Sequence, residues 1–341
     1  MEVKTDIKSL TPKKLEEFFI QIGEPKYKAK QVFSWLHKNV NDFGEMTDLS
    51  IALRSKLEEK AEIICPEIKK RLVSNIDNTV KYLYGFSDRE NVESVLMEYH
   101  HGNTVCISTQ AGCRMDCSFC ASSLNGLSRN LAPSEMLSQV LSTQSDSGTR
   151  ISNVVLMGIG EPLDNYDNVI DFLNILTAPG GVNIGQRHIS LSTCGLVDRI
   201  YDLMKEKLQI TLSVSLHAPN DELRSRIMPV NRKWNVDCLL KACKDYTNVT
   251  KRRISFEYAL IDGVNDMPEC ARELGAKLKG MLCHVNLIPA NTVAERGIKK
   301  SGDDKVQRFS DILSAWGLTV TVRRTLGSDI NASCGQLRLN H

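Results

Sequence analysis

The chain has 341 residues, of which 42% are hydrophobic and 25% charged, so it can form a large globular domain with a smaller one beside it. A formal net charge of +2 at pH 7 excludes a strong overall attraction to nucleic acid, so such contacts would need local patches. Because it lacks an apolar run long enough to span a membrane and a signal peptide, we expect a cytoplasmic protein whose 11 cysteines are thiols, metal ligands or catalysts.

The first part of the chain, residues 1–65, is predicted to be a small helical domain. Thr11 can cap a helix that has Pro12 in its first turn, and helical spacing of apolar residues continues through residues 9–62. Residues 66–98 then form a short β extension, because apolar and polar residues alternate there around turn residues.

The remainder, residues 99–341, is predicted to be an incomplete (β/α)6 barrel of the TIM-like α/β class. A strand at 103–112 enters this domain, and six parallel strands then alternate with crossover helices. In such barrels the chemistry lies at the C-terminal ends of the strands. We expect these six strands at 151–161, 188–195, 210–218, 252–261, 283–289 and 319–324, and helices at 133–144, 168–176, 196–206, 237–247, 267–280 and 303–317.

Three cysteines, Cys113, Cys117 and Cys120, have the spacing CxxxCxxC in a segment typical of a loop. Thiolates hold zinc or iron–sulfur clusters, and a structural zinc site normally has four ligands, whereas no fourth Cys or His is close here. Three thiolates on a four-iron cluster leave one iron open for S-adenosylmethionine (SAM), as in radical SAM enzymes, and Phe119 is the usual aromatic of that motif. The alternatives are buried thiols or a zinc site with a distant ligand.

Polar residues follow the predicted strands at their ends. In GIGEP, residues 158–162, the glycines permit close approach of the backbone, and Glu161 can accept a hydrogen bond from an ammonium group such as that of SAM. LSTCG at 191–195, SLH at 215–217 and Asn291 can bind the ribose, carboxylate or adenosine of SAM. Each of these motifs alone is also compatible with a turn or a helix cap.

Two further cysteines suggest thiol chemistry. Cys334 lies in a small, polar, glycine-bearing loop that makes its thiol reachable, and Cys106 lies on the strand that leads into the cysteine-rich loop. If both face the site, covalent and redox chemistry between them becomes possible. The alternative for each is a buried structural cysteine.

These motifs, together with NLIP and the C-terminal SDINASCGQL, occur in one order that resembles the RlmN/Cfr family of radical SAM RNA methyltransferases. The resemblance covers nearly the whole chain, including residues 24–50, which look like the accessory domain of that family. It implies an incomplete β/α barrel, one [4Fe-4S] cluster and two SAM molecules per turnover. Departures at Ile159, Asn331, Ser333 and the segment after Asn291 remove no reacting group.

The resemblance also implies a role for each matching residue. Cys334 would carry the methyl group as S-methylcysteine, Glu93 would accept a proton, and Cys106 would form a transient disulfide with Cys334 as the methylated RNA leaves. A radical derived from the second SAM would activate the carried methyl group for addition to adenine. Cys113, Cys117 and Cys120 would bind the cluster, and Gly160, Glu161, Ser192, Ser215, Leu216, His217 and Asn291 would bind SAM.

The implied activity is methylation of adenosine C2 in 23S rRNA, at the peptidyl-transferase centre, and in tRNA, 3′ of the anticodon. The nearest alternative is Cfr-type C8 methylation of rRNA, although Pro162 is typical of the RlmN branch. A non-catalytic iron–sulfur protein that binds RNA and a radical SAM enzyme for a small molecule are further alternatives.

Partners follow from the same resemblance. We expect a monomer that contacts 23S rRNA and tRNA, receives electrons from a flavodoxin or ferredoxin and makes no membrane contact. A group of lysines in the N-terminal domain is either a solvated helix face or an RNA contact, and it consists of Lys26, Lys28, Lys30 and Lys38.

Overall fold

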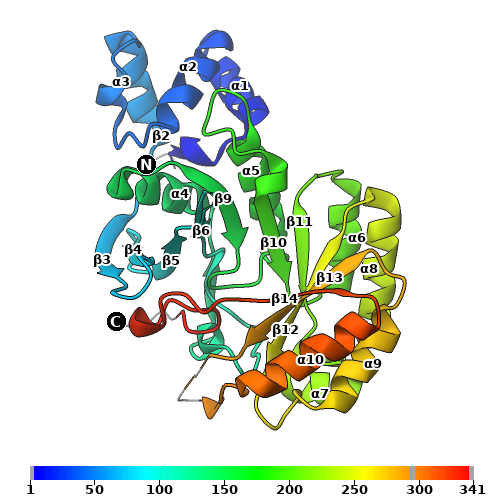
Figure 1. The fold of residues 1–341 in the computed structure, drawn as a ribbon. Helices are drawn as coiled ribbons and strands as arrows, with labels where there is room; N and C mark the ends of the chain where they lie inside the picture. Colours follow the sequence, from blue (N-terminus) through cyan, green and yellow to red (C-terminus); the bar gives the residue numbers. More distant parts are fainter. Residues whose placement is uncertain (1–3, 101, 292, 294–295, 338–341) are drawn as a thin grey trace.

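The N-terminal helices form a module at one end of a larger β/α body in this computed structural model, which describes residues 4–100, 102–291, 293 and 296–337 (Figure 1). Short parallel strands at its two ends pair with each other. The elements of this module are β1 (Thr5–Asp6), α1 (Pro12–Gln21), α2 (Tyr27–Leu36), α3 (Ile51–Lys60) and β2 (Ala61–Glu62).

Side-chain caps mark where α1 and α3 begin. Thr11 caps α1 with its hydroxyl, and Pro12 is the first helical residue, which confirms the prediction for this helix. Helix α3 begins only after Ser50, whose Oγ accepts the N–H of Leu53 at 3.3 Å. Residues 46–50, within the range 9–62 that was predicted to have helical spacing, are therefore not helical.

The larger body is built on one main sheet. Its strands are β3 (Glu67–Val73), β4 (Val80–Gly85), β5 (Asn91–Met97), β6 (Asn103–Cys106), β9 (Ile151–Leu156), β10 (Ile189–Thr193), β11 (Thr211–Ser215), β12 (Ile254–Leu260), β13 (Cys283–Pro289) and β14 (Thr319–Val322).

Within the described residues this sheet has the order β14-β13-β12-β11-β10-β9-β6-β5-β4-β3, with β14 and β3 at its edges. The strands from β6 to β14 run parallel, so an open, incomplete β/α barrel is confirmed. Strand β6 pairs with β9 and adds one parallel strand to the six that were expected beyond the cysteines. The antiparallel β extension continues the same sheet, because β5 pairs with β6.

Helices on the outside of the sheet connect successive parallel strands, and Figure 1 shows α6, α8, α9 and α10 along this outer side. The sequence patterns missed α7, which is capped by Asn220 and is too short to show a full apolar period. No helix of the described chain is long and apolar enough to cross a membrane. These helices are α4 (Pro133–Ser147), α5 (Tyr166–Thr177), α6 (Val197–Lys205), α7 (Asp221–Ile227), α8 (Val236–Thr250), α9 (Pro268–Leu278) and α10 (Asp303–Ala315).

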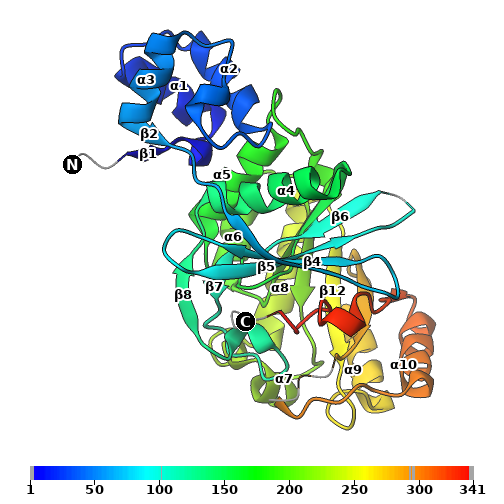
Figure 2. The ribbon, with the colours of Figure 1, turned by 90° about the vertical axis from the view of Figure 1, so that its left-hand side faces the viewer.

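After β14 the chain runs back across the body to the antiparallel strands, as the red segment in Figures 1 and 2 shows. We call residues 326–337 the C-terminal loop. The turn between β3 and β4 holds it, because Asp77 Oδ2 accepts the N–H of Gly327 at 2.9 Å and Ser74 Oγ donates to Asp329 Oδ1 at 2.7 Å. Two segments far apart in the sequence are thereby fixed to each other.

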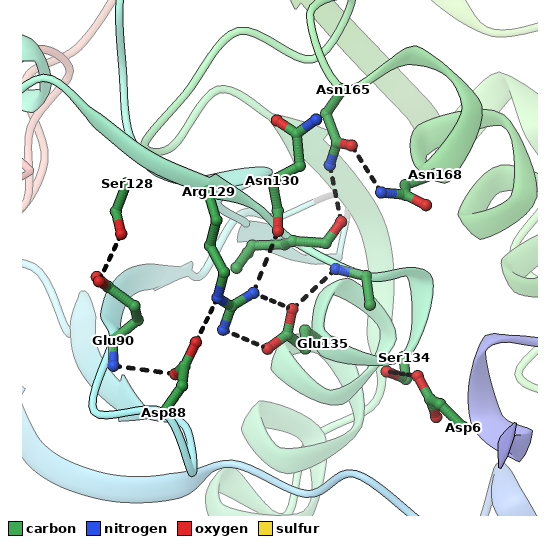
Figure 3. A network of polar contacts seen from close by, with 12 residues as sticks. Asp6, Asp88, Glu90, Ser128, Arg129, Asn130, Ser134, Glu135, Asn165 and Asn168 are labelled. Carbon is green, nitrogen blue, oxygen red and sulfur yellow. Dashed lines mark hydrogen bonds and ion pairs between the residues drawn. The ribbon is translucent and has the colours of Figure 1, made fainter. Parts of the chain in front are cut away.

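A polar network holds the hairpin of β7 (Gln110–Gly112) and β8 (Leu127–Asn130), which frames the cysteine loop, residues 113–126 (Figure 3). Arg129 on β8 donates two hydrogen bonds of 2.7 Å to the Glu135 carboxylate and another to Asp88, in the turn between β4 and β5. Glu135 also accepts the N–H of Ala132 at 2.8 Å, at the start of α4. The end of the cysteine loop is thus tied to both α4 and the antiparallel strands.

We predict that Arg129→Met lowers the free energy of unfolding by about 2–3 kcal/mol, because it leaves a nearly buried carboxylate without its guanidinium partner. Urea unfolding measures this change. The control is Lys205→Met, whose pair with Asp202 lies in solvent and should change stability by no more than about 0.5 kcal/mol. Equal losses in the two variants would contradict the prediction.

Candidate active site

A cavity of about 170 Å³, here called the main cavity, lies at the C-terminal ends of the parallel strands. This is where β/α barrels place their chemistry. Three predicted site residues, Glu93, Cys106 and Leu216, are not among its lining residues. The predicted residues that do line it are Cys113, Cys117, Cys120, Gly160, Glu161, Ser192, Ser215, His217, Asn291 and Cys334.

A tight contact between backbone atoms joins the two ends of the cysteine loop, whose cysteines line the main cavity. Gly112 has φ +80°, and a Cβ added there would lie 2.0 Å from the carbonyl oxygen of Gly126. The N–H of Cys113 donates to that same carbonyl at 2.9 Å. A side chain at position 112 would therefore separate the two ends of the loop.

The three thiols of the loop are at least half-buried at the wall of the main cavity. Burial raises the pKa of Cys113 to about 12 and raises the pKa values of Cys117 and Cys120, so metal binding must displace protons from them. No three His, Cys, Asp or Glu side chains in the described ranges converge closely enough for a single metal ion. Three soft donors beside one cavity instead fit an iron–sulfur cluster, which spreads its thiolates around a larger body.

Glu161 is a buried carboxylate that joins two strand ends. Its Oε1 accepts the N–H of Leu163 at 3.0 Å, and its Oε2 accepts the N–H of Cys194, after β10, at 2.7 Å. Burial raises the pKa of Glu161, and these hydrogen bonds act in the opposite direction. Glu161 also lines the main cavity, so the expected contact of its carboxylate with an ammonium group is compatible with its position.

The adjacent Gly160 has φ +105°, and a Cβ there would lie 2.6 Å from the side chain of Gln110. Gln110 Oε1 in turn accepts the N–H of Glu161 at 2.8 Å. Glycine at this position therefore lets the GIGEP turn approach β7 closely.

His217 presents a hydrogen-bond donor to the main cavity. Burial, with Arg224 nearby, lowers the pKa of His217 to about 3, so the ring is neutral. Its Nδ1 accepts the N–H of Ala259 at 2.9 Å, which assigns the ring hydrogen to Nε2. The edge-to-face ring of Phe119, with centroids 4.8 Å apart, connects this histidine to the cysteine loop.

Leu216 lies between two cavity-lining residues but directs its side chain into the core, where it is fully buried. Its backbone N–H donates to the carbonyl of Glu257 at 3.1 Å, and its carbonyl accepts from Arg224 Nε at 3.1 Å. Its side chain is thus part of the packing beneath the cavity.

Cys334 is half-buried and lines the main cavity from the C-terminal loop. Asn291 Nδ2 donates to the Cys334 carbonyl at 3.0 Å, so this predicted SAM residue also positions the thiol-bearing loop. The N–H of Ala121 donates to the carbonyl of Gly335 at 2.8 Å. Cys334 is therefore held directly against the cysteine loop.

Cys106 is buried beneath the C-terminal loop, in an apolar cluster with Val95, Ala332 and Leu337. Its pKa is raised to about 12, mainly by burial and further by the nearby Cys334 thiol. The structure thus brings Cys106, beneath the C-terminal loop, near Cys334 on that loop, both as free thiols.

Glu93 lies away from the main cavity. It is on β5, 1% exposed, and its Oε1 is 3.0 Å from the Nζ of Lys81. It lines a second cavity, whose other lining residues are Lys70, Leu72, Lys81, Asp329, Ile330, Asn331 and Gln336.

Two charged residues of the main cavity were missed in the sequence. Glu257 is a buried acid within the apolar strand β12 and accepts from Asn286 Nδ2 at 2.7 Å. The pKa of Arg323, after β14, is raised first by Cys334 and also by Glu257 and Cys106. A charged residue within an apolar strand was a signal that could have identified Glu257.

Comparisons with known proteins agree with this geometry. The model of the ribosomal RNA large subunit methyltransferase N-terminal domain matches residues 5–63, and that of the Radical SAM superfamily matches residues 107–274. The probable dual-specificity RNA methyltransferase RlmN of Alkaliphilus oremlandii is 54% identical over 338 residues, 99% of this chain and 98% of that protein. That of Clostridium botulinum (strain Eklund 17B) is 56% identical over 319 residues, 94% and 92% of the two chains.

A solved structure extends the similarity to the fold. The crystal structure of a radical SAM methyltransferase from Sphaerobacter thermophilus has a TM-score of 0.94 and 41% identity, and the match covers 98% of this chain and 100% of that one. The open barrel with three cysteines at its strand ends is thus that of a radical SAM enzyme. Within that class, this chain belongs to the RlmN family of methyltransferases. Membership implies a [4Fe-4S] cluster and SAM, which the thiols and the main cavity fit.

We predict that Glu161→Gln weakens SAM binding by about tenfold or more, because an amide –NH₂ would face a backbone N–H that now donates to the carboxylate. The measurement is the Kd for SAM of the anaerobically reconstituted protein, with cluster content checked by absorbance. Glu222→Gln, an exposed substitution on α7, is the control. An unchanged Kd with a full cluster would refute this role of Glu161.

Proposed function

We propose that this protein methylates C2 of adenosine in 23S rRNA, at the peptidyl-transferase centre, and in tRNA, 3′ of the anticodon. The relatives that support this proposal carry the name dual-specificity RNA methyltransferase, and the N-terminal match is to a ribosomal RNA methyltransferase domain. Pro162 in the GIGEP turn favours C2 over the Cfr-type C8 product.

The position of Cys334 is the observation that carries the proposal. Its thiol lines the same cavity as Cys113, Cys117 and Cys120, although more than 200 residues separate it from them in sequence. A methyl group bound to Cys334 Sγ would thus lie at the wall of the cavity that the cluster and SAM would share. This arrangement suits a thiol that carries the methyl group between SAM and RNA.

Direct methyl transfer to adenine C2 is chemically difficult, because this ring carbon is a poor nucleophile. When bound, the cluster and two SAM molecules per turnover supply the methyl group and the radical that activates it. Cys334 accepts the methyl group and presents it to the adenine, which must leave its stack to enter the cavity.

Release of the product requires a second thiol, and we assign this role to Cys106, which is near Cys334. As a thiolate it attacks the sulfur of Cys334, the S–S bond forms, and the electron pair of the broken S–C bond goes to the carbon, which takes up a proton. Burial raises the pKa of Cys106, and the neighbouring Arg323 guanidinium acts in the opposite direction, toward the thiolate form. We assign to Glu93 removal of the ring proton from the RNA adduct.

Exposed lysines on the N-terminal module support an RNA contact there. Lys38 lies over the ring of Trp35 at 3.9 Å, and Lys28 lies 5.4 Å from the ring centroid of Tyr27, which is 60% exposed. Cations beside accessible aromatic rings suit phosphates and unstacked bases. Lys26, the residue before α2, and Lys30, on its first turn, are exposed as well.

The remaining parts of the proposal concern the cellular setting. The reaction consumes electrons at low potential, so we assign a flavodoxin or ferredoxin as donor. We also propose that the protein acts as a cytoplasmic monomer, where its cysteines stay reduced.

We predict that anaerobically reconstituted protein with SAM, a reductant and an unmodified 23S rRNA fragment forms 2-methyladenosine, detected by mass spectrometry after digestion. Cys334→Ala should reduce the product at least about a thousandfold, because it removes the methyl carrier. Cys106→Ala should accumulate a covalent protein–RNA adduct, visible as a shifted band on a denaturing gel.

The matched control is Cys238→Ala, an exposed cysteine on α8 that should leave the rate unchanged. Formation of 8-methyladenosine would move the protein to the Cfr-type activity. SAM cleavage without RNA methylation would refute the proposed substrate. Full activity of Cys334→Ala would refute the carrier role.

A further inference from the structure

The segment that follows β13 contacts both of the loops that meet at the main cavity. Asn291, at its start, donates to the Cys334 carbonyl on the C-terminal loop at 3.0 Å. Arg296, further along the same segment, instead reaches the cysteine loop. None of the motifs by which the sequence resembles its family includes Arg296, so its contacts need an explanation of their own.

The Arg296 guanidinium joins two places in the cysteine loop. Its Nη2 donates to Asp116 Oδ1 at 3.0 Å and to Ser123 Oγ at 3.2 Å. Asp116 immediately precedes Cys117, and Ser123 Oγ donates in turn to the carbonyl of Cys120 at 3.2 Å. A single side chain thus connects the two sides of the segment that carries Cys117 and Cys120.

This segment has little regular structure to hold it in place. Within the described chain, residues 113–120 belong to no helix or strand. Asp116 has φ +49°, in the left-handed region that a residue other than glycine adopts at a cost in free energy. Side-chain contacts such as those of Arg296 therefore have to maintain the turn.

The position of Arg296 also suits a contact with a cluster. The Arg296 side chain is 24% exposed, but its Nε is buried and has no hydrogen-bond partner within the described ranges. A buried donor of this kind fits a sulfur atom as its acceptor. Burial raises the pKa of Cys120, and the charge of Arg296 is among the influences in the opposite direction, which places the guanidinium near this thiol.

We propose that Arg296 is a positioning residue that closes the cysteine loop around the bound cluster and thereby slows the loss of iron. The inference rests on the assignment of Cys113, Cys117 and Cys120 as cluster ligands, and it is independent of the RNA substrate. Reduction adds one negative charge to a cluster, so a nearby guanidinium favours the reduced form and raises the reduction potential. The same residue therefore affects two properties that are measured separately.

The test compares Arg296→Met and Arg296→Lys with wild type in full-length protein that is reconstituted anaerobically without SAM. The first quantity is the rate at which bathophenanthroline removes iron, followed by absorbance. The second is the midpoint potential of the cluster, followed by EPR during a redox titration. Arg308→Met is the matched control, because Arg308 is an exposed cation on the outer helix α10.

For Arg296→Met we expect iron to be removed at least about threefold faster than from wild type, because the contacts across the loop are lost. Its midpoint potential should shift to lower values, since a positive charge is removed. Arg296→Lys should keep the potential of wild type, since the charge is kept. Arg308→Met should match wild type in both quantities.

A second variant tests the same contacts from the cysteine loop. Ser123→Ala removes the hydroxyl that links Arg296 to the Cys120 carbonyl, and it should lose iron at least about twofold faster than wild type. The double variant with Arg296→Met should lose iron no faster than Arg296→Met alone, because the two changes break one set of contacts.

An unchanged rate of iron loss or an unchanged potential in Arg296→Met would overturn the inference and leave the proposed function standing. So would a lower urea midpoint of the cluster-free protein, because that result marks a defect of the whole fold. If Arg296→Met does not fold, an unchanged rate in Ser123→Ala overturns the inference instead. If wild type takes up no cluster, the assignment of the three cysteines fails, and this inference fails with it.

Discussion

The hydrogen bond from the Ala121 N–H to the Gly335 carbonyl, 2.8 Å long, is the contact on which the site depends. It joins the cysteine loop to the C-terminal loop, and the bond of 2.9 Å from Ser122 Oγ to the Leu337 carbonyl lies beside it. Since neither loop belongs to the main sheet, this contact rather than strand pairing sets the position of Cys334 relative to the cysteines. Loop contacts therefore position the proposed methyl carrier and the proposed cluster ligands, whereas the barrel supplies the wall around them.

The wall itself is stiffened by buried charged side chains. Arg224, which is fully buried, donates to the carbonyls of Cys194 at 2.6 Å and of Ser215 at 3.1 Å, and so ties the ends of β10 and β11 together. Glu161 ties β9 to β10 in the same way through backbone N–H groups. Burying such charged groups costs free energy unless all their hydrogen bonds are made. Separation of the strand ends would break these hydrogen bonds, so the strand ends have little freedom to separate.

Local patterns were sufficient for the parts of the molecule that depend on neighbouring residues. The CxxxCxxC spacing and polar residues at strand ends predicted ten of the residues that line the main cavity, because parallel strands end at the same edge. Long-range contacts were beyond such patterns: Arg323 is one charged residue among many until β14 places it beside Cys334. Leu216 shows a different limit of such patterns. It lies in the SLH motif between two residues that line the cavity, but successive side chains of an extended segment point to opposite sides, so its own side chain faces the core.

The path of the C-terminal loop has a consequence for synthesis of the protein. The segment that covers the main cavity leaves the ribosome after every strand of the sheet that it covers, because β14 precedes it in the chain. The cysteines at 113, 117 and 120 are thus made more than 200 residues before Cys334. Cys334 can be placed over them only in the last stage of synthesis and folding.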